Sequence, residues 1–185
     1  LEDTLAYRVF AVGGNRSGYT NLVLRDSSGT RVENSETQDY YSFRGQLLWT
    51  PSDTVEGRLI ADYTKRDELC CSAVQWDYTA TAAALVGAVG GQVAFPADPD
   101  ARVAYANHPY VQQVEDWGFS AEFDIEVPIG TLTSVTAYRN WANQRSQDID
   151  FSGADIAYRD LDNNYTDISR LSQELRLTGV TGDLD

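Results

Sequence analysis

Two runs of strict alternation between apolar and polar residues dominate the middle of the chain. From Tyr41 to Trp49 every second residue is apolar or glycine, and polar residues such as Arg44 take most positions between them. The alternation returns from Val55 to Tyr63, after the turn-forming residues 50–53. Because successive side chains of a strand point to opposite faces, a period of two predicts strands and excludes helices. The two runs therefore predict a β-hairpin with one apolar and one polar face.

Four further runs predict four more strands. They are Leu5 to Val12, Trp117 to Val127, Leu132 to Trp141 and Ile168 to Thr178. The second of these is the cleanest, with aromatic and aliphatic side chains on one face and carboxylates on the other. The sequence thus predicts an all-β fold built on an antiparallel meander of about six strands.

Short turns and long loops alternate between these strands. Residues 50–53 and 128–130 form the tight turns, while long loops are expected at about 14–39, 67–116 and 143–166. The first loop holds one strand-like piece, Tyr19 to Leu24, and is expected to form at most a short hairpin. The second is Ala-rich from Tyr78 to Val89, which predicts a short helix capped by Thr79 or Thr81 and ended by Gly90 and Gly91.

The apolar face of the first hairpin has the dimensions of a membrane-facing surface. Tyr41 to Trp49 spans eight residue steps, or roughly 26 Å of strand with aromatic residues at both ends. This matches the apolar band of about 25 Å in a transmembrane β-barrel, which also has short periplasmic turns and long extracellular loops. The alternative is a soluble β-sandwich, in which the apolar faces would form the core.

Composition narrows the choice of partners. The formal net charge of −14 argues against nucleic acid, because binding to phosphates requires a basic surface. No run approaches the roughly 18 consecutive apolar residues of a membrane-spanning helix. The sequence holds no methionine, so the chain is expected to have been cut or processed from something longer.

Four stretches together resemble a known family. They are Arg44 to Pro51, Arg58 to Tyr63 followed by Glu68 to Cys71, Leu132 to Arg139, and Ser172 to Leu177. In this order they are similar to the barrel of TonB-dependent outer-membrane receptors, most closely those of sphingomonad-like and caulobacter-like bacteria. The resemblance spans nearly the whole chain.

The resemblance implies that residues 1–185 are part of a transmembrane β-barrel of about 22 strands, in the outer membrane of a Gram-negative bacterium. Such a receptor imports a scarce nutrient, for example siderophore-bound iron, cobalamin, a saccharide or an aromatic compound, with TonB-derived energy. The plug domain and TonB box are expected outside this chain. Residues 50–53 would lie at the periplasmic rim, with Tyr41 and Tyr63 at the outer aromatic girdle.

The implied partners are the TonB complex through the plug, outer-membrane lipid and lipopolysaccharide, and the imported nutrient. A fragment of six strands would have two open edges, so in isolation it is expected to self-associate. Two other functions remain open from the sequence alone. One is a soluble β-rich binding or adhesion module, and the other is a passive porin-type channel.

Ligand capture is expected from loop aromatics and from lumen-facing arginines. Aromatic rings stack on sugars or aromatic ligands, whereas guanidinium groups hold carboxylates or a ferric chelate. The alternative is that the aromatics pack within their own loops and the charges pair with one another. The candidates are Trp76, Tyr78, Tyr105, Tyr110, Tyr158 and Tyr165, with Arg44, Arg58 and Arg139.

The adjacent cysteines, an acidic loop and the single histidine are the remaining candidates for chemistry. The adjacent Cys70 and Cys71 form either a vicinal disulfide or two free thiols. Asp148, Asp150 and Ser152 match the first, third and fifth positions of a calcium loop, but Arg159 stands where the bidentate Glu is required, so a solvated acidic loop without metal is expected. With His108 as the single histidine and no nucleophile motif, the sequence indicates neither an enzyme nor a cofactor.

Overall fold

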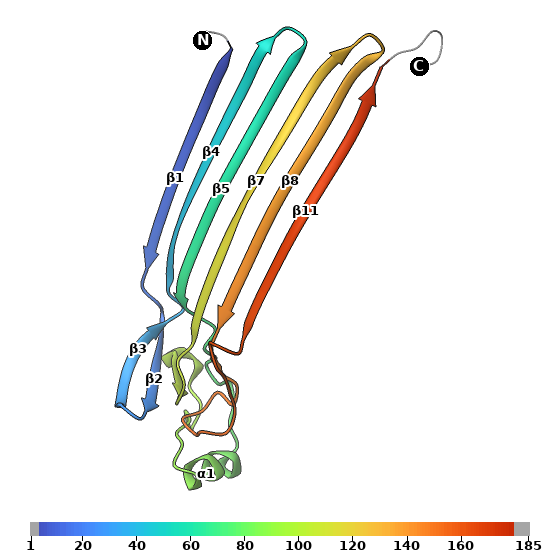
Figure 1. Ribbon diagram of the computed structural model, residues 1–185. Coiled ribbons are helices and arrows are strands. Elements are labelled where there is room, and N and C mark those ends of the chain that lie inside the picture. Colours follow the sequence, from blue (N-terminus) through green and yellow to red (C-terminus); the bar gives the residue numbers. More distant parts are fainter. Residues whose placement is uncertain (1–3, 180–185) are drawn as a thin grey trace.

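The computed structural model describes residues 4–179, and its main feature is one antiparallel sheet of six long strands (Figure 1). The order of strands in the sheet is β1-β4-β5-β7-β8-β11, so the six long strands lie side by side in the order in which they occur in the chain. This confirms the predicted all-β class and the antiparallel meander. The strands are β1 (Leu5–Arg16), β4 (Gln38–Ser52), β5 (Val55–Leu69), β7 (Val111–Val127), β8 (Gly130–Arg145) and β11 (Tyr165–Thr178).

The observed register agrees with the alternating pattern, because this register places the apolar residues of neighbouring strands on the same face. Trp49 lies opposite Gly57, and Gly57 lies opposite Phe123. A Cβ atom at Gly57 would stand 2.9 Å from the ring of Phe123 and 3.4 Å from that of Trp49. The two rings therefore cover the glycine, which lets large aromatics approach each other across three strands.

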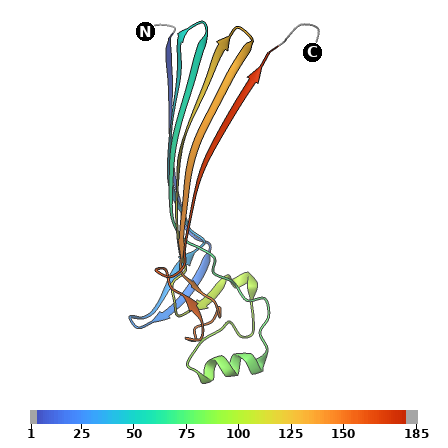
Figure 2. The same ribbon diagram turned by 45° about the vertical axis from the view of Figure 1, so that its right-hand side comes forward.

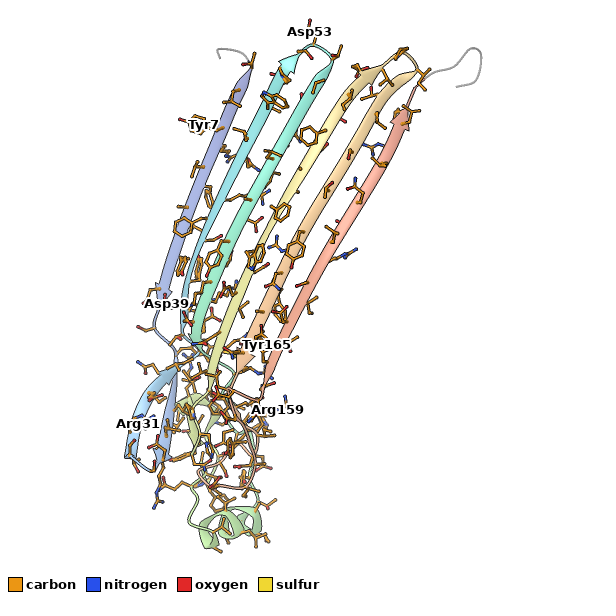
Figure 3. All side chains as sticks on the ribbon, viewed as in Figure 1. Tyr7, Arg31, Asp39, Asp53, Arg159 and Tyr165 are labelled. Carbon is orange, nitrogen blue, oxygen red and sulfur yellow. A yellow bond between two sulfur atoms is a disulfide. The ribbon has the colours of Figure 1, made fainter. Side chains whose placement is uncertain are left out.

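The six-stranded sheet is a single layer within residues 4–179 (Figure 2). No second sheet packs on either face, and large apolar side chains stand exposed along it, including Tyr7 at 80% and Leu171 at 71%. Side chains project from both sides of the strands over the whole length of the sheet (Figure 3). The structure is therefore not the β-sandwich of the alternative prediction.

The strands are longer than the alternation predicts, and one turn is displaced. β4 continues through Ser52, so the turn lies at residues 53–54 instead of 50–53. The pairing of β4 with β5 shifts register between Trp49 and Ser52. Pro51 lies inside this irregularity, where its missing N–H is tolerated. The proline therefore marks a bulge at the end of the strand and not the turn itself.

The three long connections gather at one end of the sheet into a folded lobe (Figures 1 and 2). A small sheet has the order β3-β2-β6, from β2 (Thr20–Asp26), β3 (Gly29–Ser35) and β6 (Val103–Ala106), with β2 and β6 parallel. The lobe also holds the short pair β9 (Gln147–Asp148) and β10 (Tyr158–Arg159), and the 3-10 turn η1 (Pro99–Ala101). The short hairpin allowed within 14–39 is present as β2 and β3, and these strands make most of this segment strand instead of loop.

The buried core of the described chain lies in the lobe and not in the large sheet. Leu22, Leu24, Ala104, Ala106 and Tyr110 pack together, and Phe151 packs against them. This cluster joins all three long connections, since its members come from β2, from β6 with the residues after it, and from the segment after β9. The lobe therefore has a hydrophobic core of its own.

The predicted helix is present as α1 (Ala80–Ala88). Thr79 is its N-cap, and the Thr79 hydroxyl accepts a hydrogen bond from the Ala82 amide at 3.1 Å. Gly90 follows with φ of +81°, a conformation that favours glycine at a helix end. Within residues 4–179, no helix is long and apolar enough to cross a membrane.

Candidate functional site

The face of the large sheet that carries most charged side chains, here called the polar face, is organised around Arg139 on β8. Arg139 Nη1 lies 3.1 Å from Asp62 Oδ2, and Nη2 lies 2.8 Å from Asp116 Oδ2. Arg139 thus reaches carboxylates on two other strands. These ion pairs link β8 to both β5 and β7.

Gly118 on β7 allows the Arg139 side chain to contact Asp62 on β5. It stands between Asp62 and Arg139 in the register, so no side chain separates the two charged groups. A Cβ atom at this position would stand 2.8 Å from the Tyr138 carbonyl oxygen and 3.5 Å from Arg139 Nη1. Since the nearer atom belongs to the backbone, it cannot rotate away, and the sheet would have to shift.

Replacing Gly118 by Ala is therefore expected to destabilise the sheet by about 1–3 kcal/mol, the usual cost of overpacking. Gly45→Ala on β4 is the matched control, because a Cβ there would meet nothing within 4 Å. Equilibrium unfolding of the two variants in urea measures the difference. Equal losses of stability would show that the close approach at Gly118 is unimportant.

The three predicted arginines lie on the polar face but have different surroundings. Arg139 is held by two carboxylates, as described, and Arg58 Nη2 lies 3.4 Å from Glu56 Oε1. Arg44 has no ion pair within residues 4–179. It lines a hollow of about 270 Å³ together with Arg8, Phe10 and Gln46.

The predicted loop aromatics do not converge on one site. Tyr110 is 1% exposed in the lobe core, and its hydroxyl donates to the Asp148 carbonyl at 2.9 Å, so its assignment as a ligand contact was wrong. Trp76 is 85% exposed, and the Tyr165 hydroxyl donates to Asp167 on the same strand. Tyr78 and Tyr105 are half-buried in separate parts of the lobe. These five aromatics therefore do not line one common surface.

Tyr158 is the exception, because it stacks on His108 with ring centroids 3.7 Å apart. His108 Nε2 is 3.2 Å from Asp155 Oδ1, and this hydrogen bond holds the pKa of the Asp155 carboxyl below its usual value. His108 and Asp155 border a cleft of about 590 Å³ in the lobe. The turn of the β2–β3 hairpin and the end of α1 form the opposite wall, where Arg25 Nη1 donates to the Gly90 carbonyl at 3.0 Å.

Asp148 is fully buried beneath this region. Its Oδ2 accepts hydrogen bonds from the Asn107 amide at 2.9 Å and from the His108 amide at 3.5 Å, whereas its Oδ1 has no hydrogen-bond partner. Burial raises the pKa of the Asp148 carboxyl to about 6, against the lowering effect of the two amides. A single backbone loop thus holds a buried carboxylate whose charge is only partly compensated.

The calcium candidates are not assembled as a metal site. Asp150 uses Oδ1 to accept from the Ser152 amide and hydroxyl, and Oδ2 to accept from the Ile156 and Ala157 amides. Its carboxylate is therefore occupied in shaping the loop. No group of three or more histidine, cysteine or acidic residues placed to hold a metal occurs in residues 4–179.

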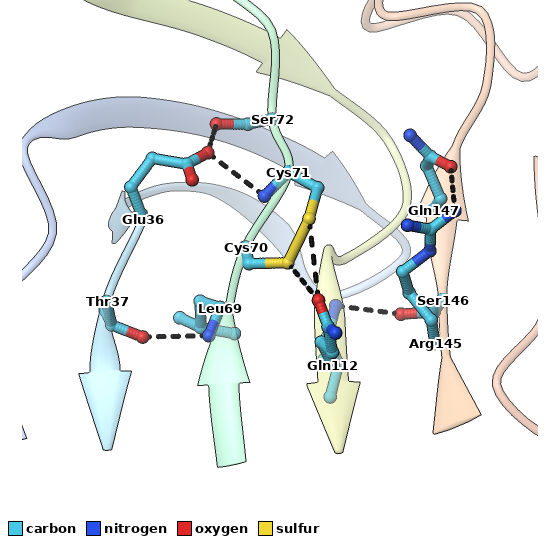
Figure 4. Close-up of a disulfide and its surroundings, with 11 residues drawn as sticks. Glu36, Thr37, Leu69, Cys70, Cys71, Ser72, Gln112, Arg145, Ser146 and Gln147 are labelled. Atoms are coloured by element: carbon cyan, nitrogen blue, oxygen red, sulfur yellow. Dashed lines mark hydrogen bonds between the residues drawn. A yellow bond between two sulfur atoms is a disulfide. The ribbon is translucent and has the colours of Figure 1, made fainter. Parts of the chain in front are cut away.

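Cys70 and Cys71 are joined in a vicinal disulfide at the junction of the large sheet and the lobe (Figure 4). Glu36 Oε1 accepts from the Cys71 amide and from the Ser72 hydroxyl, each at 3.1 Å. On the other side, the Cys70 amide donates to the Tyr110 carbonyl at 3.2 Å. The disulfide therefore lies where the chain leaves β5, between the segments that enter β4 and β7.

The apolar face of the sheet carries two aromatic groups. Nearer the lobe, Tyr41 contacts both Phe43 and Tyr63, and Tyr138 contacts both Trp117 and Phe119. Trp49 and Phe123 lie toward the tight turns, around Gly57. Aliphatic and small residues occupy the interval between the two groups, among them Leu47, Leu59, Ala61 and Ala121.

Comparison of the chain with protein-family models, curated protein sequences and solved structures found no match. The hollow around Arg44, to which Arg8, Phe10 and Gln46 contribute, was not predicted from the sequence. The same holds for the lobe cleft that His108 and Asp155 border. The spacing of Arg8 and Phe10, two residues apart, was a usable signal, because it places both on one face of β1.

Proposed function

We propose that this chain forms part of the barrel wall and the extracellular lobe of a TonB-dependent outer-membrane receptor, which imports a small nutrient. The single observation that carries the proposal is the uncovered apolar face, bounded by aromatic groups, on a one-layer antiparallel sheet. In water such a face would be unfavourable by about 25 cal/mol for each Å² of apolar surface. In a bilayer the same face is solvated by lipid chains.

The arrangement of connections supports the proposal. Tight turns join β4 to β5 and β7 to β8 at one end of the sheet, and the connections that contain the lobe lie at the other end (Figure 1). Outer-membrane barrels have this asymmetry, with short turns toward the periplasm and long segments outside. Each of the six strands has at least 12 residues, whereas about 9–11 suffice to cross a bilayer.

The two edges of the sheet are consistent with a larger barrel. β1 and β11 each pair on one side only within the described residues. Open edges expose unpaired backbone groups, which are costly in lipid. The proposal therefore includes further strands of the same barrel on both sides. The four sequence stretches that resemble TonB-dependent receptors favour an importer over a passive channel.

Tryptophan fluorescence tests the orientation of the sheet in the membrane. The full-length protein is reconstituted into vesicles of brominated phosphatidylcholine, with a single tryptophan retained in each variant. Trp49 and Trp117 lie on the apolar face and are expected to be strongly quenched by bromine on the lipid chains. Vesicles of the same lipid without bromine give the reference intensity.

The other two tryptophans are internal controls. Trp76 lies exposed in the lobe, and Trp141 stands opposite Asp116 on the polar face. Both are expected to keep most of their fluorescence. Equal quenching of all four tryptophans, or none for Trp49 and Trp117, would contradict the proposed membrane-facing surface.

A further inference from the structure

The hollow between Arg8, Phe10, Arg44 and Gln46 combines two guanidinium groups with an aromatic wall on the polar face. In the register, Arg8 stands opposite Gln46 and Phe10 stands opposite Arg44, so the four residues form a square over two strands. All four alternate onto the same face because each pair is separated by two positions along its strand. Phe10 is half exposed and faces solvent or ligand instead of a packed core.

Both guanidinium groups of the hollow are unpaired within residues 4–179. Asp62 is the cross-strand partner of Arg44, yet Asp62 Oδ2 is turned to Arg139 Nη1 at 3.1 Å. In contrast, Arg58 and Arg139 on the same face have carboxylates within 4.0 Å. What distinguishes the hollow is that two guanidinium groups without an ion pair in the described chain, those of Arg8 and Arg44, line the same cavity.

The local charge is positive although the chain is acidic overall. In the two rows of the register that contain the hollow, Arg8, Arg44, Arg139 and Arg170 stand on the polar face with one carboxylate, Asp62. The whole chain has a formal net charge of −14. Guanidinium groups hold carboxylates through paired N–H donors, and an unpaired group offers that geometry to a ligand.

We propose that the hollow binds a small organic anion that presents a carboxylate to Arg8 and Arg44 and an apolar or aromatic body to Phe10. Its volume of about 270 Å³ lies at the small end of ligand pockets, which favours a compact molecule. Gln46 adds one amide that can donate to a second oxygen. The inference rests on the proposed function for the location of the hollow in the barrel lumen, and it names the chemical class of the imported compound.

Calorimetric titration of the full-length protein in detergent with benzoate tests the site. Benzoate carries one carboxylate on one ring, and benzyl alcohol is the neutral analogue of similar shape. The protein is expected to bind benzoate and not benzyl alcohol. Arg44→Gln and Arg8→Gln are each expected to weaken benzoate binding about tenfold or more, because each removes a charged hydrogen-bond donor.

Arg176→Gln is the matched control, since Arg176 lies on the same face but on β11, away from the hollow, and is paired with Glu174. It is expected to bind benzoate as the parent protein does. Absence of benzoate binding by the parent protein, or equal weakening by Arg176→Gln and Arg44→Gln, would overturn the proposal. Circular dichroism of each variant separates loss of the site from loss of the sheet.

The benzoate titration can fail without failure of the quenching experiment, and the reverse is also true. Quenching of Trp49 and Trp117 by brominated lipid without benzoate binding would support the proposed barrel wall and contradict the proposed anion site. Benzoate binding that depends on Arg8 and Arg44, without such quenching, would support the anion site and contradict the proposed barrel. The two experiments thus judge the two proposals independently.

Discussion

Leu59→Arg is expected to lower the free energy of unfolding of the membrane-inserted protein by about 2–4 kcal/mol. Leu59 lies on the apolar face of β5, between Gly57, where Trp49 and Phe123 meet, and Tyr63 in the aromatic group nearer the lobe. The proposed function places this interval near the middle of the bilayer. A guanidinium at that depth loses its hydration, and its side chain must bend toward an interface to recover it.

Ile60→Arg is the matched control, because it introduces the same charge one residue along the same strand. Ile60 stands between Gln46 and Ser120 on the polar face, where water would be available in a barrel lumen. Its expected cost is about 1 kcal/mol or less, as for most surface substitutions. Reversible unfolding in urea from lipid vesicles measures both variants. If Ile60→Arg costs as much as Leu59→Arg, the two faces do not differ as proposed.

The sequence predicted the large sheet well because its alternation is a direct consequence of strand geometry. Trp117 to Val127 presents one apolar and one charged face, and no competing pattern is present. Strand ends were less predictable. β7 begins at Val111, six residues before the clean alternation, because its first residues are mainly polar and pair with β5 through backbone hydrogen bonds that any residue can make.

The lobe was underpredicted for a different reason. β3 contains Arg31, Glu33 and Asn34, so it shows no apolar alternation. It is held by pairing with β2 and by the ion pair of Arg31 with Asp26 on β2. β6 is short and pairs in parallel with a strand about eighty positions earlier in the chain. Such distant pairing leaves no local signal. By contrast, the helix was predictable because its cap at Thr79 and its Ala-rich body are local.

The sequence predicted which arginines lie on the polar face, but it did not predict which of them form ion pairs. Alternation alone places Arg44, Arg58 and Arg139 on one face. Whether each is paired depends on the register, which brings Gly118 between Asp62 and Arg139 and so takes Asp62 away from Arg44. Register depends on how two neighbouring strands pair, so the pattern within one strand does not reveal it. The unpaired state of Arg44 therefore became visible only in the structure.

The stability of the lobe is expected to fall as pH rises from about 4 to about 6, because of Asp148. Burial raises the pKa of this carboxyl to about 6 in the folded protein, whereas an unfolded Asp has a pKa of about 3.9. Between these values the folded state binds a proton that the unfolded state has released. The contribution of Asp148 to stability is thus greatest below pH 4, and it falls by up to about 3 kcal/mol as the pH rises past 6.

Asp148→Asn isolates this contribution. The amide cannot ionise, while its oxygen can still accept from the Asn107 amide, so the fall in stability between pH 4 and pH 6 is expected to shrink markedly. At pH 7 the variant is expected to be more stable than the parent, since it no longer buries a charge whose Oδ1 has no donor. Hydrogen exchange at the Leu22 and Leu24 amides of the lobe core, corrected for intrinsic exchange rates, measures this stability. Parallel pH profiles for variant and parent would show that other groups control the lobe, among them Asp150 and His108 beside Asp148.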